Sequence, residues 1–153
     1  MDAIDVRILE VLQENARVSI SELSKRINLS LSAVSERLKK LERSKIINCY
    51  TAILDPKLLG RDLSVYISIG LEASSDTQAF LDFVAGDPEI LECHYITGEY
   101  DYLLKVTTTN TDSLEKIMNK IKSFNGIKHT QTNVILSTIK NRHSISPKRS
   151  EYI

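Results

Sequence analysis

The chain has 153 residues, of which 42% are hydrophobic and 26% charged, and its twenty basic side chains equal its twenty acidic ones in number. This composition is typical of a folded protein with room for one ordinary domain or two small ones, and it excludes an intrinsically disordered chain. No apolar run approaches the roughly 18 residues that cross a membrane, and MDAIDVRILEVL has acids where a secretion signal has cations. We therefore expect a cytoplasmic protein without a membrane partner.

The first 45 residues predict three short amphipathic helices. A helix over residues 2–14 would turn one apolar face inward, formed by Ile4, Ile8, Leu9 and Leu12. A second helix would begin at Ser19, because Ser19 and Glu22 have the spacing of a capping box. Its inward residues would be Ile20, Leu23 and Ile27. Three such helices make the smallest helix-turn-helix unit that binds DNA.

Residues 28–30 predict the sharp turn of this motif. Asn28 tolerates a left-handed backbone, Leu29 can fill the angle between the helices, and Ser30 can cap a third helix. The third helix would turn Val34, Leu38 and Leu41 inward. Its outward stripe would be polar, with Ser32, Glu36, Lys39 and Arg43 at its centre and Ser35 and Lys40 on its flanks. A groove of DNA would meet this stripe.

The charge distribution supports a division of the chain into two halves. Residues 25–45 hold seven cations and two acids, whereas residues 51–140 hold eight cations and twelve acids. A basic run is often only the solvated face of a helix, but here it coincides with the capped pair of helices. The pattern favours nucleic-acid binding by the first half and another role for the second.

The second half predicts the order βαββαβ. Strands are expected over 63–73, 90–97, 100–109 and 127–140, with a hairpin across Gly98 and Glu99. One helix would be capped at residues 75–78, turn Phe80, Leu81 and Val84 inward and stop at residues 86–88. The other would be capped at residues 112–115, turn Leu114, Ile117, Met118 and Ile121 to the sheet and end at residues 125–126. This order is typical of a ferredoxin-like α+β fold.

The predicted organisation is a helix-turn-helix domain over 1–47, a connector with a short strand at 50–54 over 48–61, a ferredoxin-like domain over 62–140 and a loose polar tail over 141–153. Both helices of the second domain would cover the same face of its sheet. The chain has no further element for the other face. We therefore expect a second copy of the chain to pair there.

Four segments resemble, in order and spacing, the Lrp/AsnC (feast/famine) family of bacterial and archaeal transcriptional regulators. They are IDVRILEVLQENAR, SISELSKRINLSLSAVSERLKKLE, IINCYTAILDPKLLG and YITGEYDYLLKV, and the match covers nearly the whole chain. The resemblance implies an N-terminal DNA-binding domain, a strand-forming connector and a C-terminal ligand-sensing domain that forms dimers through its sheets and often assembles them into octamers. It also implies small effectors, usually amino acids, bound between dimers.

One position departs from the family pattern. Lys45 stands where the family commonly has the glycine that ends the recognition helix. A left-handed lysine costs on the order of 1 kcal/mol, so we expect the helix to run on or to end differently.

Recognition helices read bases with their N-terminal turns. We therefore expect the base edges to be nearest Ser30, Ser32, Ala33, Ser35 and Glu36. Further along the helix, Lys39, Lys40 and Arg43 would contact phosphates. Arg37 matches a basic position of the family motif, but an internal ion pair with Glu22 or Glu42 is an alternative.

The residues Gly98, Glu99, Tyr100 and Asp101 could form nothing more than a hairpin turn. The resemblance implies that this loop is the effector site. Glu99 or Asp101 would then receive an ammonium group, amides near Gly98 a carboxylate and Tyr100 the side chain. Thr130 and Thr132 are candidate contacts from the same or a neighbouring subunit.

We expect no metal, no cofactor and no enzymatic activity, because Cys49 and Cys93 lack metal-ligand spacing and no phosphate loop or catalytic series occurs. The main hypothesis is a DNA-binding regulator whose dimer presents two recognition helices roughly 34 Å apart. Two alternatives stay open. One is an RNA-binding module, although the basic aromatic strand signature is missing. The other is a small-molecule enzyme on a dimeric ferredoxin-like barrel.

Overall fold

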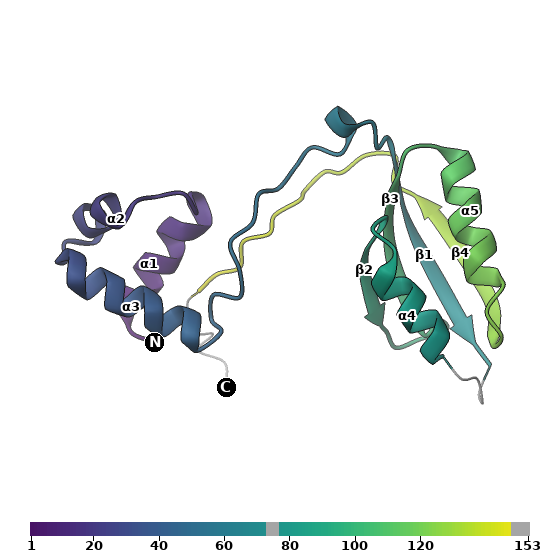
Figure 1. Cartoon of the computed structure of the whole chain (residues 1–153), viewed down its shortest axis with the longest axis horizontal. Coiled ribbons are helices and arrows are strands. Elements are labelled where there is room, and N and C mark those ends of the chain that lie inside the picture. Colours follow the sequence, from purple (N-terminus) through teal and green to yellow (C-terminus); the bar gives the residue numbers. More distant parts are fainter. Residues whose placement is uncertain (73–76, 148–153) are drawn as a thin grey trace. The chain divides into compact units, whose positions relative to one another are not determined.

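The computed structural model describes residues 1–72 and 77–147, which form two compact units (Figure 1). One unit contains residues 1–53 together with the tail from residue 140, and the other contains residues 54–139. Within the described residues, the helices are all too short or too polar to cross a bilayer.

The first unit is built on three helices, α1 (Ala3–Glu14), α2 (Ile20–Ile27) and α3 (Leu31–Arg43). Six apolar side chains with at most 8% exposure form its core, and they come from all three helices: Ile8, Leu9, Leu23, Ile27, Val34 and Leu41. Leu12, Leu29 and Leu38 pack against this core from its edge. The predicted helical periods are therefore confirmed, except at Ile20, which is 43% exposed because the first turn of α2 extends beyond the core.

Local caps fix where these helices begin. Asp2 caps α1 in a capping box with Asp5, and Ser30 caps α3 as predicted. Ser19 caps α2 by accepting a hydrogen bond from the Glu22 amide, but the reciprocal half of the predicted capping box is missing. The Glu22 carboxylate instead pairs with Arg26 at 2.6 Å, one helical turn along.

The turn between α2 and α3 forms as predicted, whereas the end of α3 differs. Asn28 is left-handed, with φ of 58°. Lys45 is left-handed too, also with φ of 58°, so the expectation that the helix would avoid this conformation is wrong. The Lys45 amide donates to the Glu42 carbonyl at 3.0 Å and the Ile46 amide to the Leu41 carbonyl at 3.1 Å. These are the two bonds of a Schellman motif, which offset the steric cost at Lys45.

The second unit is an antiparallel sheet in the order β2-β3-β1-β4, with two helices on one face (Figure 1). In chain order its elements are β1 (Leu63–Leu71), α4 (Gln78–Gly86), β2 (Ile90–Tyr95), β3 (Tyr102–Thr108), α5 (Thr111–Lys122) and β4 (Ile127–Val134). Its core packs Val65, Ile67, Ile69, Leu104 and Val106 of the sheet against Phe80, Val84, Ile117 and Ile121 of the helices. The predicted ferredoxin-like βαββαβ fold is confirmed.

Several predicted boundaries move. α5 is capped by Asn110 in a capping box with Ser113, so the expected cap at Asp112 lies inside the helix. The helix ends at Lys122, before residues 125–126, and β4 ends at Val134, well short of residue 140. The predicted cap of α4 at Ser75 and Asp76 lies outside the described residues.

The connector is extended but does not form the predicted strand at residues 50–54. A strand needs a neighbour for its backbone groups, and these residues have none within the described chain. A turn of 3-10 helix, η1 (Lys57–Leu59), follows before β1.

The tail also differs from the expected loose segment. Its residues 140–147 belong to the first unit, and the Ile145 amide donates to the Gln13 side chain of α1 at 2.7 Å.

Candidate functional site

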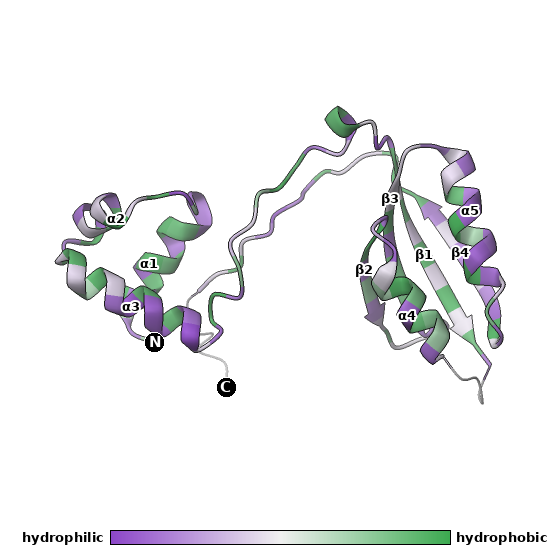
Figure 2. Cartoon of the chain, viewed as in Figure 1, coloured by the Kyte–Doolittle hydropathy of each residue, from purple (hydrophilic) through white to green (hydrophobic). Residues whose placement is uncertain are grey.

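The outward face of α3 is polar and basic. Ser30, Ser32, Glu36, Lys39, Lys40 and Arg43 are exposed, whereas Ala33 and Ser35 are half-buried. Purple, hydrophilic segments along α3 follow this pattern (Figure 2). The Glu36 carboxylate lies 3.4 Å from the Lys39 ammonium, a surface pair too weak to hold the lysine away from a phosphate.

The N-terminal turn of α3 is held by its own cap. The Ser30 hydroxyl accepts a hydrogen bond from the Ala33 amide at 3.2 Å and lies 3.1 Å from the Ser32 hydroxyl. Val34 and Leu41 are buried in the core behind this face. The helix therefore presents a fixed row of small polar groups followed by cations. The small polar groups suit contacts with base edges in a DNA groove, and the cations suit contacts with the phosphates beside it.

Arg37 lies on the shoulder of α3 and turns toward α1. Its Nη1 is 2.7 Å from Asp2 Oδ2 and 2.7 Å from Asp5 Oδ1, and the Asp5 side chain is only 4% exposed. Hydrogen bonds to Asp2 and then to Asp5 raise the pKa of Arg37. The backbone of Asp5, followed by the Arg37 side chain, lowers the pKa of Asp2. An internal ion pair does form, but with α1 instead of the expected Glu22 or Glu42.

Glu42 has another partner. The Tyr50 hydroxyl donates to Glu42 Oε1 at 3.0 Å, which ties the connector to α3. Burial, followed by this bond, raises the pKa of Tyr50 to about 12. Tyr50 also lines an open, mostly apolar cavity of about 710 Å³ between α1, residues 46–53 and the tail. Sequence reasoning found neither feature, because the bond depends on how the chain turns back after α3 and the cavity on where the tail returns.

In the second unit, backbone bonds shape the loop from Ile96 to Asp101. The Ile96 amide donates to the Asp101 carbonyl at 2.8 Å, and Gly98 has φ of 122°, which favours glycine. Asp101 also accepts the Leu71 amide on Oδ2 at 2.7 Å, so part of its carboxylate fastens the loop to β1. The Glu99 side chain is exposed, and no hydrogen bond or ion pair holds it within the described chain.

Tyr100 leaves this loop across the face of the sheet that the helices do not cover. Its hydroxyl donates to Gln131 Oε1 at 2.8 Å, and its ring centroid is 4.9 Å from that of His129. The His129 ring lies directly over Gly70, where a Cβ would come within 2.3 Å of it. The Nε2 of His129 is buried and, among the described residues, without a hydrogen-bond partner.

The structure does not bring Thr130 and Thr132 to this loop within one chain. They pair with Ile69 and Ile67 of β1 and so share the helix-covered face, where the Thr132 hydroxyl lies 3.1 Å from the Met118 sulfur. Their neighbours His129 and Gln131 take the position expected for the threonines. Strand alternation predicts that residues 129 and 131 face away from 130 and 132, but the register with β1 decides which pair faces the helices.

A capped, polar-faced third helix on a three-helix unit, joined to a separate α+β unit with an exposed acidic loop, defines a DNA-binding protein with a sensing domain. The winged helix-turn-helix DNA-binding model matches residues 1–48, and the Lrp/AsnC ligand binding domain model matches residues 64–145. The chain therefore belongs to the Lrp/AsnC family of transcriptional regulators.

Relatives and solved structures agree over most of the chain. It is 34% identical to the HTH-type transcriptional regulator FL11 of Pyrococcus horikoshii over 92% of each chain. It is 36% identical to the leucine-responsive regulatory protein of Escherichia coli strain K12, over 92% of this chain and 87% of that protein. A Neisseria meningitidis transcriptional regulator in complex with L-Met is 35% identical, with a TM-score of 0.89 over 95% of this chain and 96% of that one.

Proposed function

We propose that α3 is the recognition helix and that it enters the major groove of operator DNA with its outward face. Ser30, Ser32, Ala33, Ser35 and Glu36 lie nearest the bases, and Lys39, Lys40 and Arg43 contact phosphates. The single observation behind this proposal is the exposed polar row of α3 on a buried core. We assign Arg37 to holding α3 against α1, because two carboxylates already occupy its guanidinium.

A salt titration of DNA binding tests the phosphate contacts. Lys39→Ala removes one cation from the proposed interface, so the slope of log affinity against log salt becomes shallower by about 0.9. Lys116→Ala, at an exposed position of α5 in the other unit, is the matched control and leaves the slope unchanged. A slope that stays the same in Lys39→Ala excludes this lysine from the interface.

We further propose that the loop Gly98 to Asp101 binds an amino-acid effector. Glu99 or Asp101 receives the ammonium group, amides near Gly98 the carboxylate, and Tyr100 contacts the side chain. The exposed, unpaired Glu99 supports this assignment, as does the amino acid bound to the Neisseria regulator. Thr130 and Thr132 face α5 in their own chain, so we propose that they contact the effector only from a neighbouring subunit.

Calorimetry with a panel of amino acids tests the effector site. Glu99→Gln removes the charge from a side chain that binds no other group. The ammonium role is supported if this variant folds normally and binds the best amino acid of the panel more weakly than the unmodified protein does. Asp101→Asn is the matched variant, because its amide oxygen still accepts the Leu71 amide. If both variants bind the best amino acid as tightly as the unmodified protein, the ammonium role is wrong.

We propose that the working form in the cytoplasm is a homodimer that assembles into an octamer, with effector binding shifting this assembly. Among the described residues of the second unit, no helix or strand covers the sheet face opposite α4 and α5 (Figure 1). The connector also exposes apolar side chains, among them Ile53 at 62% and Leu54 at 66%. Burial of such a surface against a second copy stabilises association. Multi-angle light scattering with and without the effector tests this, and a monomer at micromolar concentration would contradict it.

A further inference from the structure

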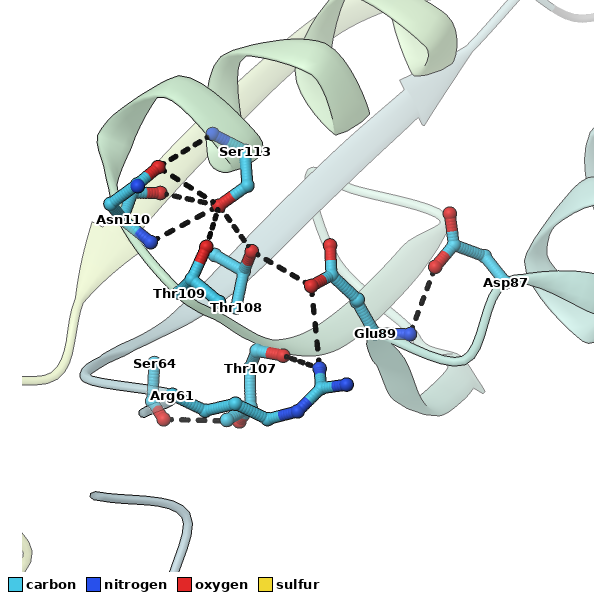
Figure 3. Close-up of polar contacts among 9 residues, drawn as sticks. All are labelled: Arg61, Ser64, Asp87, Glu89, Thr107, Thr108, Thr109, Asn110 and Ser113. Atoms are coloured by element: carbon cyan, nitrogen blue, oxygen red, sulfur yellow. Dashed lines mark hydrogen bonds and ion pairs between the residues drawn. The ribbon is translucent and has the colours of Figure 1, made fainter. Parts of the chain in front are cut away.

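A polar network lies at one end of the sheet, where the connector enters β1, β3 ends and α5 begins (Figure 3). The Nη1 of Arg61 donates to the Thr107 carbonyl at 3.2 Å and to Glu89 Oε1 at 3.3 Å. The Thr108 hydroxyl contacts the same Glu89 oxygen at 3.1 Å and the Ser113 hydroxyl at 2.5 Å. The network therefore joins the connector, the start of β2, the end of β3 and the first turn of α5.

Each member of the network is fixed by a further bond. The Glu89 amide donates to Asp87 Oδ1 at 2.9 Å, and Ser113 forms the capping box of α5 with Asn110. Thr107 and Thr108 are 5% and 0% exposed. Buried polar groups that all have partners resist displacement, because moving one leaves another unpaired. Arg61 therefore binds to a rigid part of the second unit.

The last turn of the connector is closed by its own bonds. Asp55 Oδ1 accepts the Lys57 amide at 2.9 Å, and the Arg61 amide donates to the Pro56 carbonyl at 2.9 Å. The leucines of this turn, Leu58 and Leu59, are 85% and 59% exposed, so apolar packing on the sheet is small. Among the described residues, the side-chain bonds from this turn to the sheet all come from Arg61.

We propose that Arg61 is a positioning residue for DNA recognition at paired half-sites. It fastens the last turn of the connector to the sheet and so fixes the direction in which the connector leaves the second unit. If the connectors are fixed, the two recognition helices of a dimer keep one separation and reach two half-sites at one spacing. If the connectors are loose, the separation varies, and the effective concentration of the second helix at its half-site falls. Arg61 itself contacts no DNA in this scheme. The inference rests on the proposed binding of a dimer to two half-sites.

The test compares duplexes with one and with two half-sites. A duplex recovered from a random 40-bp pool by the unmodified protein is the probe. It is measured together with a version in which one half-site is scrambled and one in which the spacing is lengthened by about 5 bp, half a helical turn. In Arg61→Ala we expect unchanged affinity for the single half-site, roughly tenfold weaker binding to the paired probe and a smaller preference for the selected spacing. Arg61→Lys restores part of the affinity for the paired probe and part of the spacing preference. Lys57→Ala, in the same turn, changes neither of these two quantities.

Each outcome decides the matter. The inference is overturned if Arg61→Ala folds and keeps the preference for the selected spacing. It is also overturned if this variant loses the same factor of affinity for the single half-site and for the paired probe. If Arg61→Ala does not fold, Glu89→Gln takes its place, since it removes the charge that Arg61 binds and leaves an oxygen for Thr108. An unchanged spacing preference in Glu89→Gln then overturns the inference. If the unmodified protein itself binds both probes equally, the proposed recognition by a dimer fails instead.

Discussion

Replacing Lys45 by glycine is expected to stabilise the protein, although it removes a complete side chain. Lys45 has φ of 58° at the end of α3, where the Schellman bonds of the Lys45 and Ile46 amides hold it. A side chain in this conformation costs about 1–2 kcal/mol, a penalty that glycine does not have. Glycine loses roughly 0.4–1 kcal/mol more backbone entropy on folding. The net expectation for Lys45→Gly is a gain of about 0.5–1 kcal/mol.

Urea unfolding followed by circular dichroism measures this gain. The midpoint rises while the slope m stays the same, because the surface exposed on unfolding does not change. Lys45→Ala is the control, since it removes the same charge but keeps a Cβ in the left-handed conformation. If Lys45→Ala is stabilised as much as Lys45→Gly, the gain comes from charge and the steric reasoning is refuted. A Lys45→Gly variant without any gain refutes it as well.

Three further predictions concern buried or crowded contacts. Arg37→Ala leaves the buried Asp5 carboxylate without its cation and lowers the free energy of unfolding, which urea unfolding measures; an unchanged midpoint would contradict this. The lowered pKa of Asp2 contributes stability that is complete above its ordinary value of 3.8 and is lost as the pH falls through the lower folded value. Unfolding midpoints between pH 5 and pH 2 should therefore fall less steeply in Asp2→Asn, and equal slopes would contradict this. Gly70→Ala places a Cβ within 2.3 Å of the His129 ring and costs about 1–3 kcal/mol, which His129→Ala in the same chain should partly recover if the contact is the cause.

The helical half of the fold could be predicted well because its signals are local. Val34 and Leu41 are buried where the helical period places them, and Ser30 caps α3 through a bond that spans only three residues. The cap of α5 was misplaced because Asn110 and Asp112 are both good capping residues. The structure has Asn110 as the cap, in a reciprocal capping box with Ser113.

Other features depend on contacts that are distant in sequence. The alternation at residues 50–54 is that of a strand, but a strand also needs a partner, and the described part of this chain does not supply one. The loop proposed as the effector site was chosen through the family resemblance, and Thr130 and Thr132 on β4 face the helices of their own chain instead of this loop. Register, with its shift between Gly70 and Leu71, determines which face they take and is not visible in the strand by itself. Arg37 shows the same limit, since a helical period places it on the shoulder of α3 but does not identify Asp5 as its partner.

The first unit is made from both ends of the described chain, so the sensing unit is in effect an insert between residues 53 and 140. A protease that cuts the exposed connector once leaves the N-terminal fragment attached only by noncovalent contacts with the tail, such as the bond of the Ile145 amide to Gln13. The three helices then stay with the sensing unit only while those contacts hold. Twisting one unit against the other must also strain two tethers instead of one, which raises the torsional stiffness of the joint above that of a single linker.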